Sequence, residues 1–138
     1  MATGKLTALS FGVAADDWNV LQTARPNVLL IGSDQAVAGF LPLLLPLLQP
    51  PITDCPNGTL TLPAGLSGTL ILHDVQRLVA GDQQRVSVWM AESARKTQVI
   101  STAPAQLYPL VERKVLSEPL FYCLNVITIA LSNPVASV

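Results

Sequence analysis

Two adjacent residues, His73 and Asp74, could carry chemistry. They follow residues 69–72, an apolar run that predicts a buried strand of a parallel sheet. A histidine and a carboxylate at the carboxyl end of such a strand could act as a general base or supply half of a metal site. Because His73 is the only histidine in the chain, a site with several histidine ligands is excluded. We favour the simpler interpretation, a hydrogen-bonded polar pair at a strand end.

The two cysteines, Cys55 and Cys123, are too few for a disulfide framework or a cysteine-rich zinc site. They predict two reduced, structural thiols in a cytoplasmic protein. Cys123 could instead be a reactive thiol. No histidine lies close to it in the sequence, however, and a packed free cysteine is the more common case.

The composition is apolar and weakly charged. Hydrophobic residues make up 50% of the chain and charged residues only 12%, about half of the usual ~25%. So few charges favour a self-associating or partner-bound domain, although a compact domain with a large core remains the alternative. The net charge is −1 and no basic block occurs, so we expect no direct nucleic-acid binding.

We expect no membrane association. The uncharged stretch 35–53 contains Pro42, Pro46, Pro50 and Pro51, which interrupt or flank its apolar run. This run is shorter than the ~20 apolar residues of a spanning helix. It predicts a buried helix instead. The N-terminal residues lack a long apolar segment followed by a cleavage site, so we expect no signal peptide.

Apolar runs alternate with helical patterns, which predicts a single domain with a parallel, three-layer α/β sheet. No internal boundary or repeat is apparent. The predicted strands are 27–31, 69–72, 98–101 and 126–131, with a short edge strand near 59–62. The predicted helices are 35–48, 82–93, 105–115 and 120–124. Prolines should kink the first of these helices, and Asp82 should be the N-cap of the second. The tail 132–138 is expected to fray.

Three segments, in order and spacing, resemble the AAA+ core of bacterial sigma-54-dependent transcriptional activators. They are GTLILHDV (68–75), QVISTA (98–103) and LSEPLFYCLNV (116–126). The family reads roughly GTLFLDEV, a strand ending in Thr-Asn, and FRxDLYYRLNV at these places. The resemblance covers about 27–131 and is strongest over 68–131. It implies that residues 1–138 form one truncated AAA+-like core, a P-loop-like three-layer fold with a parallel sheet of about five strands and no helical lid.

The resemblance also implies that most of the catalytic side chains are replaced. Of the family's phosphate loop, GExGxGKE, only Gly32 survives, and Ala38 stands at the lysine. His73 and Asp74 stand at the magnesium-binding aspartate and the water-positioning glutamate. A neutral imidazole is a poor magnesium ligand, because that ion prefers hard oxygens.

The remaining family positions are replaced as well. Pro104 stands at the sensing asparagine, and a proline side chain cannot bond to a phosphate or a water. Ser117 and Cys123 stand at the two arginines that are candidate fingers, and neither side chain can stabilise charge on a transferring phosphoryl group. The sigma-54-contacting GAFTGA phrase is absent too.

The leading hypothesis is therefore a catalytically inactive AAA+-like domain that binds no cofactor and acts through self-association or a protein partner in transcription or signalling regulation. One alternative is a nucleotide-binding switch or weak ATPase, with ATP and magnesium in a site rebuilt around His73 and Asp74. Another is a flavodoxin-like receiver whose first strand is 28–33. A phosphorylatable receiver needs an acidic cluster there, and Asp34 alone does not supply one.

Overall fold

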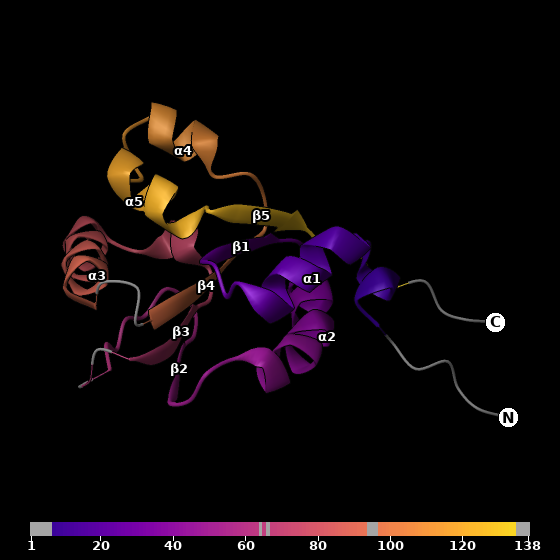
Figure 1. The fold of residues 1–138 in the computed structure, drawn as a ribbon. Coiled ribbons are helices and arrows are strands. Elements are labelled where there is room, and N and C mark those ends of the chain that lie inside the picture. Colours follow the sequence, from indigo (N-terminus) through magenta and orange to yellow (C-terminus); the bar gives the residue numbers. More distant parts are fainter. Residues whose placement is uncertain (1–6, 64, 66, 94–96, 135–138) are drawn as a thin grey trace, which may run out of the picture.

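A computed structural model describes residues 7–63, 65, 67–93 and 97–134 of the chain. Its centre is a sheet of five parallel strands in the order β2-β3-β4-β1-β5, with helices on both faces (Figure 1). The predicted three-layer α/β fold with about five strands is thus confirmed. The strands are β1 (Val28–Ile31), β2 (Ile52–Cys55), β3 (Gly68–Leu72), β4 (Thr97–Ala103) and β5 (Ile127–Ala130).

The central strands are apolar because helices cover both of their faces. Every residue of β1 and β3 is buried. Leu29 and Ile31 of β1 belong to one core cluster, whereas Val28 and Leu30 belong to the other. Successive side chains of a strand point to opposite faces, so the sheet separates two hydrophobic cores.

The helices divide between these two cores. Figure 1 shows α1 and α2 on one side of the sheet and α3, α4 and α5 on the other. No helix of the described residues is long and apolar enough to cross a membrane. The α-helices are α1 (Ala15–Thr23), α2 (Asp34–Leu44), α3 (Ala80–Ser93), α4 (Tyr108–Glu112) and α5 (Glu118–Leu124), and the 3₁₀ turns are η1 (Ala8–Phe11), η2 (Leu45–Leu47) and η3 (Val75–Arg77).

The strand order decides between two kinds of parallel sheet. In a flavodoxin-like fold the order is 2-1-3-4-5, so the first strand lies beside the second and third. Here β1 lies between β4 and β5. The receiver alternative is therefore wrong. Asp34 follows β1, and β1 is not a neighbour of β3, whereas the first and third strands of a flavodoxin-like sheet are neighbours.

The edge strand was predicted in the wrong place. It is β2, not residues 59–62, and it pairs with β3 so that Cys55 lies opposite Leu72. Prolines flank β2 on both sides and its first three residues are not fully buried, which obscured the strand pattern. The segment around Thr61 instead folds back on β2. Its N–H donates to the Cys55 sulfur and its carbonyl accepts from the thiol, both at 3.3 Å.

Two helices also differ from the prediction. The helix predicted over 105–115 is only α4, because Lys114 adopts a left-handed backbone with φ of 61°. The N–H groups of Val115 and Leu116 then turn back to the carbonyl of Leu110, which ends the helix. Helix α3 begins two residues before Asp82, so Asp82 lies in its first turn and is not the N-cap.

The ends of the described chain pack together. The N-terminal turn η1 and α1 were not predicted, and Phe11 of η1 is fully buried. Its carbonyl accepts from the N–H of Ser132 at 2.9 Å, and Asn133 accepts from the Ser33 hydroxyl at 2.9 Å. The expectation of a frayed tail is therefore wrong for Ser132 and Asn133, while residues 135–138 lie outside the described part.

Candidate functional site

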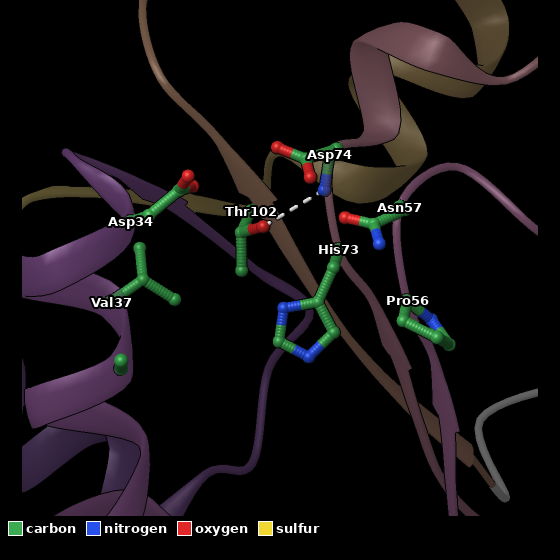
Figure 2. A pocket seen from close by; sticks show the side chains of 8 residues that line it. Asp34, Val37, Pro56, Asn57, His73, Asp74 and Thr102 are labelled. Carbon is green, nitrogen blue, oxygen red and sulfur yellow. Dashed lines mark hydrogen bonds between the residues drawn. The ribbon is translucent and has the colours of Figure 1, made fainter.

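A hollow of about 240 Å³ lies at the carboxyl ends of the strands. Parallel α/β sheets bind their ligands at this edge, where the loops that follow the strands converge. Figure 2 shows side chains from α2, from the loops after β2 and β3, and from the end of β4. The hollow is lined by Asp34, Val37, Ala38, Pro56, Asn57, His73, Asp74 and Thr102.

His73 has a carboxylate partner that the sequence did not reveal. Its Nε2 lies 2.8 Å from Oδ1 of Asp54 on β2. When Nε2–H donates to this carboxylate, the neutral ring presents the lone pair of Nδ1. In Figure 2 the imidazole projects into the space between α2 and the loop after β2. A base needs this orientation, but the side chain of Asp54 is 55% exposed, so its contact with His73 contributes at most ~1 kcal/mol to stability.

Asp74 is held in an unusual backbone conformation. Its φ of 56° lies in the left-handed region, and its N–H donates to the Thr102 hydroxyl at 3.0 Å. Asn57, on the neighbouring loop, also has a positive φ of 53°. The two loops are joined because the N–H of Gly58 donates to the His73 carbonyl at 3.1 Å. Aspartate and asparagine tolerate this region better than other non-glycine residues.

The first turn of α2, which points at the hollow, has one of its N–H groups capped by a side chain of the chain itself. The Ser33 hydroxyl accepts from the N–H of Ala36 at 3.1 Å, as an N-cap does. Asp34 adds a carboxylate to the same turn, where the positive end of the helix dipole would otherwise attract an anion. Among the described residues, no lysine or arginine lines the hollow. The arrangement therefore disfavours a phosphate group.

Among the described residues, no group of three or more histidine, cysteine or acidic side chains could hold a metal ion. The Asp74 carboxylate is half-buried beside Gln76, whose amide lies 3.4 Å from it. The described residues thus place a histidine–carboxylate pair at the rim of a small hollow whose lining also includes Asp34 and Asp74.

The structure brings together three of the seven family positions. Ala38, His73 and Asp74 line one hollow. Gly32 lies beside it at the end of β1, where a Cβ would come within 3.1 Å of Leu131, so the glycine permits close packing with the end of β5. Pro104 is exposed after β4 and does not line the hollow.

The other two positions serve the local structure. Ser117 is the N-cap of α5: its hydroxyl accepts from the N–H of Leu120, and its own N–H donates to the Gln83 side chain at 2.8 Å. Cys123 is exposed at the far end of α5, where its carbonyl accepts from the side chain of Asn27 at 3.0 Å. Asn27 precedes β1, so Cys123 lies at the amino end of the sheet, opposite the hollow.

The sequence reasoning missed Asp54, Asn57 and Thr102. A usable signal existed, because polar residues near the carboxyl ends of parallel strands meet at one edge of the sheet. It could not be applied to Asp54 and Asn57 while the edge strand was assigned to 59–62.

Comparison with known proteins supports the fold but assigns no family. No family model and no curated protein matches the chain in sequence. Solved structures of NtrX from Brucella abortus are similar in fold. The ATP complex has a TM-score of 0.67 and 13% identity, over 96% of this chain and 37% of the NtrX chain. The ADP complex has a TM-score of 0.62 and 13% identity, over 82% and 33%.

The chain therefore spans only about a third of the length of these NtrX chains. Sequence identity this low establishes a related fold alone. The predicted P-loop-like architecture is confirmed, and functions do not transfer with a fold.

Proposed function

We propose that this chain is a non-catalytic AAA+-like module of the sigma-54 activator type, which acts through protein–protein contact in transcription or signalling regulation. One observation carries the proposal. The hollow at the carboxyl edge of the sheet is lined by Asp34 and Asp74 and, among the described residues, by no lysine or arginine. The structures that are similar in fold include NtrX complexes with ATP and with ADP, so the proposal depends on the side chains of this hollow and not on the fold.

Electrostatics oppose a nucleotide in this hollow. A triphosphate would approach two carboxylates, while the helix N-terminus that would receive it already has the Ser33 cap and the Asp34 charge. Ala38 replaces the lysine of the resembling family. A single arginine finger increases the rate of hydrolysis by a factor of ~10³–10⁵. The side chains of Ser117 and Cys123 cannot supply this stabilisation of the transition state. Loss of catalysis follows from these substitutions together.

Protein contact is supported by the surface. The α4–α5 region carries an aromatic cluster in which the ring centroids of Tyr108 and Phe121 lie 5.8 Å apart and those of Phe121 and Tyr122 lie 5.2 Å apart. Phe121 is buried, whereas Tyr108 and Tyr122 are 44% and 58% exposed. Partly exposed tyrosines on a rigid support are typical contact residues of protein interfaces.

A thermal-shift titration tests the non-catalytic part of the proposal. Nucleotide at a hundredfold excess over its dissociation constant would stabilise a binding protein by ~2.7 kcal/mol, which raises Tm by about 10 °C in a domain of this size. We expect no shift with millimolar ATP or ADP, with or without magnesium. A magnesium-dependent shift of this size would overturn the proposal.

The contact part needs a separate experiment. Increasing amounts of the chain are added to an intact sigma-54 activator of the resembling type, and the rate of ATP hydrolysis is followed. Incorporation of a subunit that offers no finger is expected to lower the rate. An unchanged rate, together with no co-purification and no self-association, would count against a role in protein contact.

The His73–Asp54 pair favours a second candidate, a nucleotide switch or weak ATPase with a rebuilt site. In that case His73 would act as the base and Asp74 would face the magnesium ion. Magnesium-dependent hydrolysis that is abolished by Asp74→Ala and by His73→Ala would establish this alternative. Hydrolysis that persists in both variants would identify a contaminating ATPase.

A further inference from the structure

We propose that β5 is a self-pairing edge, through which two copies of this chain join their sheets in antiparallel orientation. This inference deepens the proposed function, on which it rests for the view that the chain acts by protein contact. The partner is a second copy of the chain.

The backbone groups on the outer side of β5 have no partner among the residues that the structure describes. Toward β1, the N–H of Ile127 donates to Asn27 at 3.2 Å and that of Leu131 donates to Ile31 at 2.7 Å. Alternate residues of a parallel strand bond to the same neighbour, so Thr128 and Ala130 direct their N–H and C=O groups outward. β5 is the last strand in the sheet order, and no described strand covers its outer side.

The open edge has a defined limit. The next outward residue, Ser132, donates its N–H to the Phe11 carbonyl at 2.9 Å, so the N-terminal turn closes the edge there. The outward groups of Thr128 and Ala130 remain. Antiparallel pairing with a second copy can satisfy them reciprocally, with Thr128 of each copy opposite Ala130 of the other.

Charge identifies a second copy as the partner. Self-association brings identical side chains together, so a surface that meets itself must avoid like charges. Residues 119–138 contain no charged side chain. Val126, which directly precedes β5, is 61% exposed and uncharged. Edge strands normally carry a charge or a proline that prevents such pairing, and β5 carries neither.

The opposite edge of the same sheet shows this protection. On β2, Pro51 and Cys55 direct their carbonyls to β3, so Ile52 and Asp54 face outward. Pairing two copies there would bring the Asp54 carboxylates together, and the prolines at 51 and 56 bound the strand. The contrast between the two edges assigns self-pairing to β5.

Sedimentation velocity of the full chain tests this inference, with variants chosen to spare the fold. Ala130 is exposed and its N–H faces outward, so Ala130→Pro removes an outward donor without removing a bond to β1. Ala130→Lys adds a charge at the edge. Two controls place the same charge elsewhere: Ile52→Lys on the opposite edge and Val79→Lys at a residue that is 64% exposed.

Wild type is expected to reach twice its monomer mass of 14.7 kDa at concentrations of about 100 μM. Both Ala130 variants should dimerise at least about tenfold more weakly with unchanged circular dichroism, while both controls still dimerise. A monomeric wild type, a dimer insensitive to both Ala130 variants, or a dimer lost in Ile52→Lys would overturn the inference. The nucleotide titration is independent: a monomer that binds no nucleotide overturns only the edge pairing, and a dimer that binds nucleotide overturns only the non-catalytic role.

Discussion

Gln83 provides a quantitative test of how Ser117, the first of the two family arginine positions, is used. Its side chain is 6% exposed and makes three hydrogen bonds between elements. Nε2 donates to the carbonyls of Leu78 and Val115, both at 3.0 Å, and Oε1 accepts from the N–H of Ser117 at 2.8 Å. One side chain of α3 therefore holds the connection between α4 and α5.

Replacing Gln83 by alanine should lower the free energy of unfolding by about 2–4 kcal/mol. A neutral hydrogen bond contributes ~1 kcal/mol net, and a buried group left without a partner costs ~1–3 kcal/mol. The Val115 carbonyl belongs to an exposed residue and can recruit water, whereas the half-buried N–H of Ser117 is less accessible. Removing the side chain also relieves up to ~2 kcal/mol of side-chain ordering entropy, so the sum of the lost interactions is an upper bound.

Urea denaturation measures this loss, with Gln84→Ala as the matched control. Gln84 is the exposed neighbour in the same helix, so its truncation should change stability by less than about 0.5 kcal/mol. The Gln83→Ala midpoint should fall by roughly 1–2 M with an unchanged slope. Gln83→Glu should be as harmful, because a carboxylate would face two carbonyl oxygens. If Gln83→Ala and Gln84→Ala cost the same, the three bonds do not hold the connection and the reasoning is refuted.

The remaining predictions concern two glycines and the two cysteine thiols. Gly68 has a φ of 103° and a Cβ there would collide with the Pro51 carbonyl, so Gly68→Ala should destabilise the fold by about 2–4 kcal/mol. A Cβ at Gly81 in α3 would meet open space, so Gly81→Ala should raise the free energy of unfolding by ~0.5–1 kcal/mol. Equal urea midpoints for Gly68→Ala and Gly81→Ala would contradict this geometry. Exposed Cys123 should react with a thiol reagent in the native state, whereas buried Cys55 should react only on unfolding. Burial raises the pKa of Cys55 above its ordinary value of 9.0, so the unfolded state loses the thiol proton at a lower pH than the folded state does. The free energy of unfolding should therefore fall as pH rises above ~9. This fall with pH should be less steep in Cys55→Ala. Equal slopes in the two proteins would exclude Cys55 as the source.

The central fold was predictable because its signal is local. β1 and β3 contain contiguous apolar runs that helices cover on both faces, and β4 has the apolar pair Val99 and Ile100 at its centre. Such runs are visible in a short sequence window. β2 was not, because an edge strand needs only one neighbour and half of its surface is exposed. Its position depends on pairing with β3, which lies outside any local pattern.

The candidate site was predictable only in part for the same reason. The adjacency of His73 and Asp74 is local, whereas the contact of His73 with Asp54 follows from the register of β2 on β3. The roles of Ser117 and Cys123 were less accessible still. A resemblance assigns them to family positions, but their hydrogen bonds to Gln83 and Asn27 come from tertiary packing.

The most direct test of the central claim, that this fold carries no nucleotide site, is an amide NMR titration of the ¹⁵N-labelled chain with magnesium and ATP. The resonances of Ala38, His73 and Thr102 report on the hollow, and that of Gly81 on a remote helix. We expect no saturable shift at Ala38, His73 or Thr102 up to millimolar ATP. A saturable shift confined to these residues, with Gly81 unchanged, would contradict it.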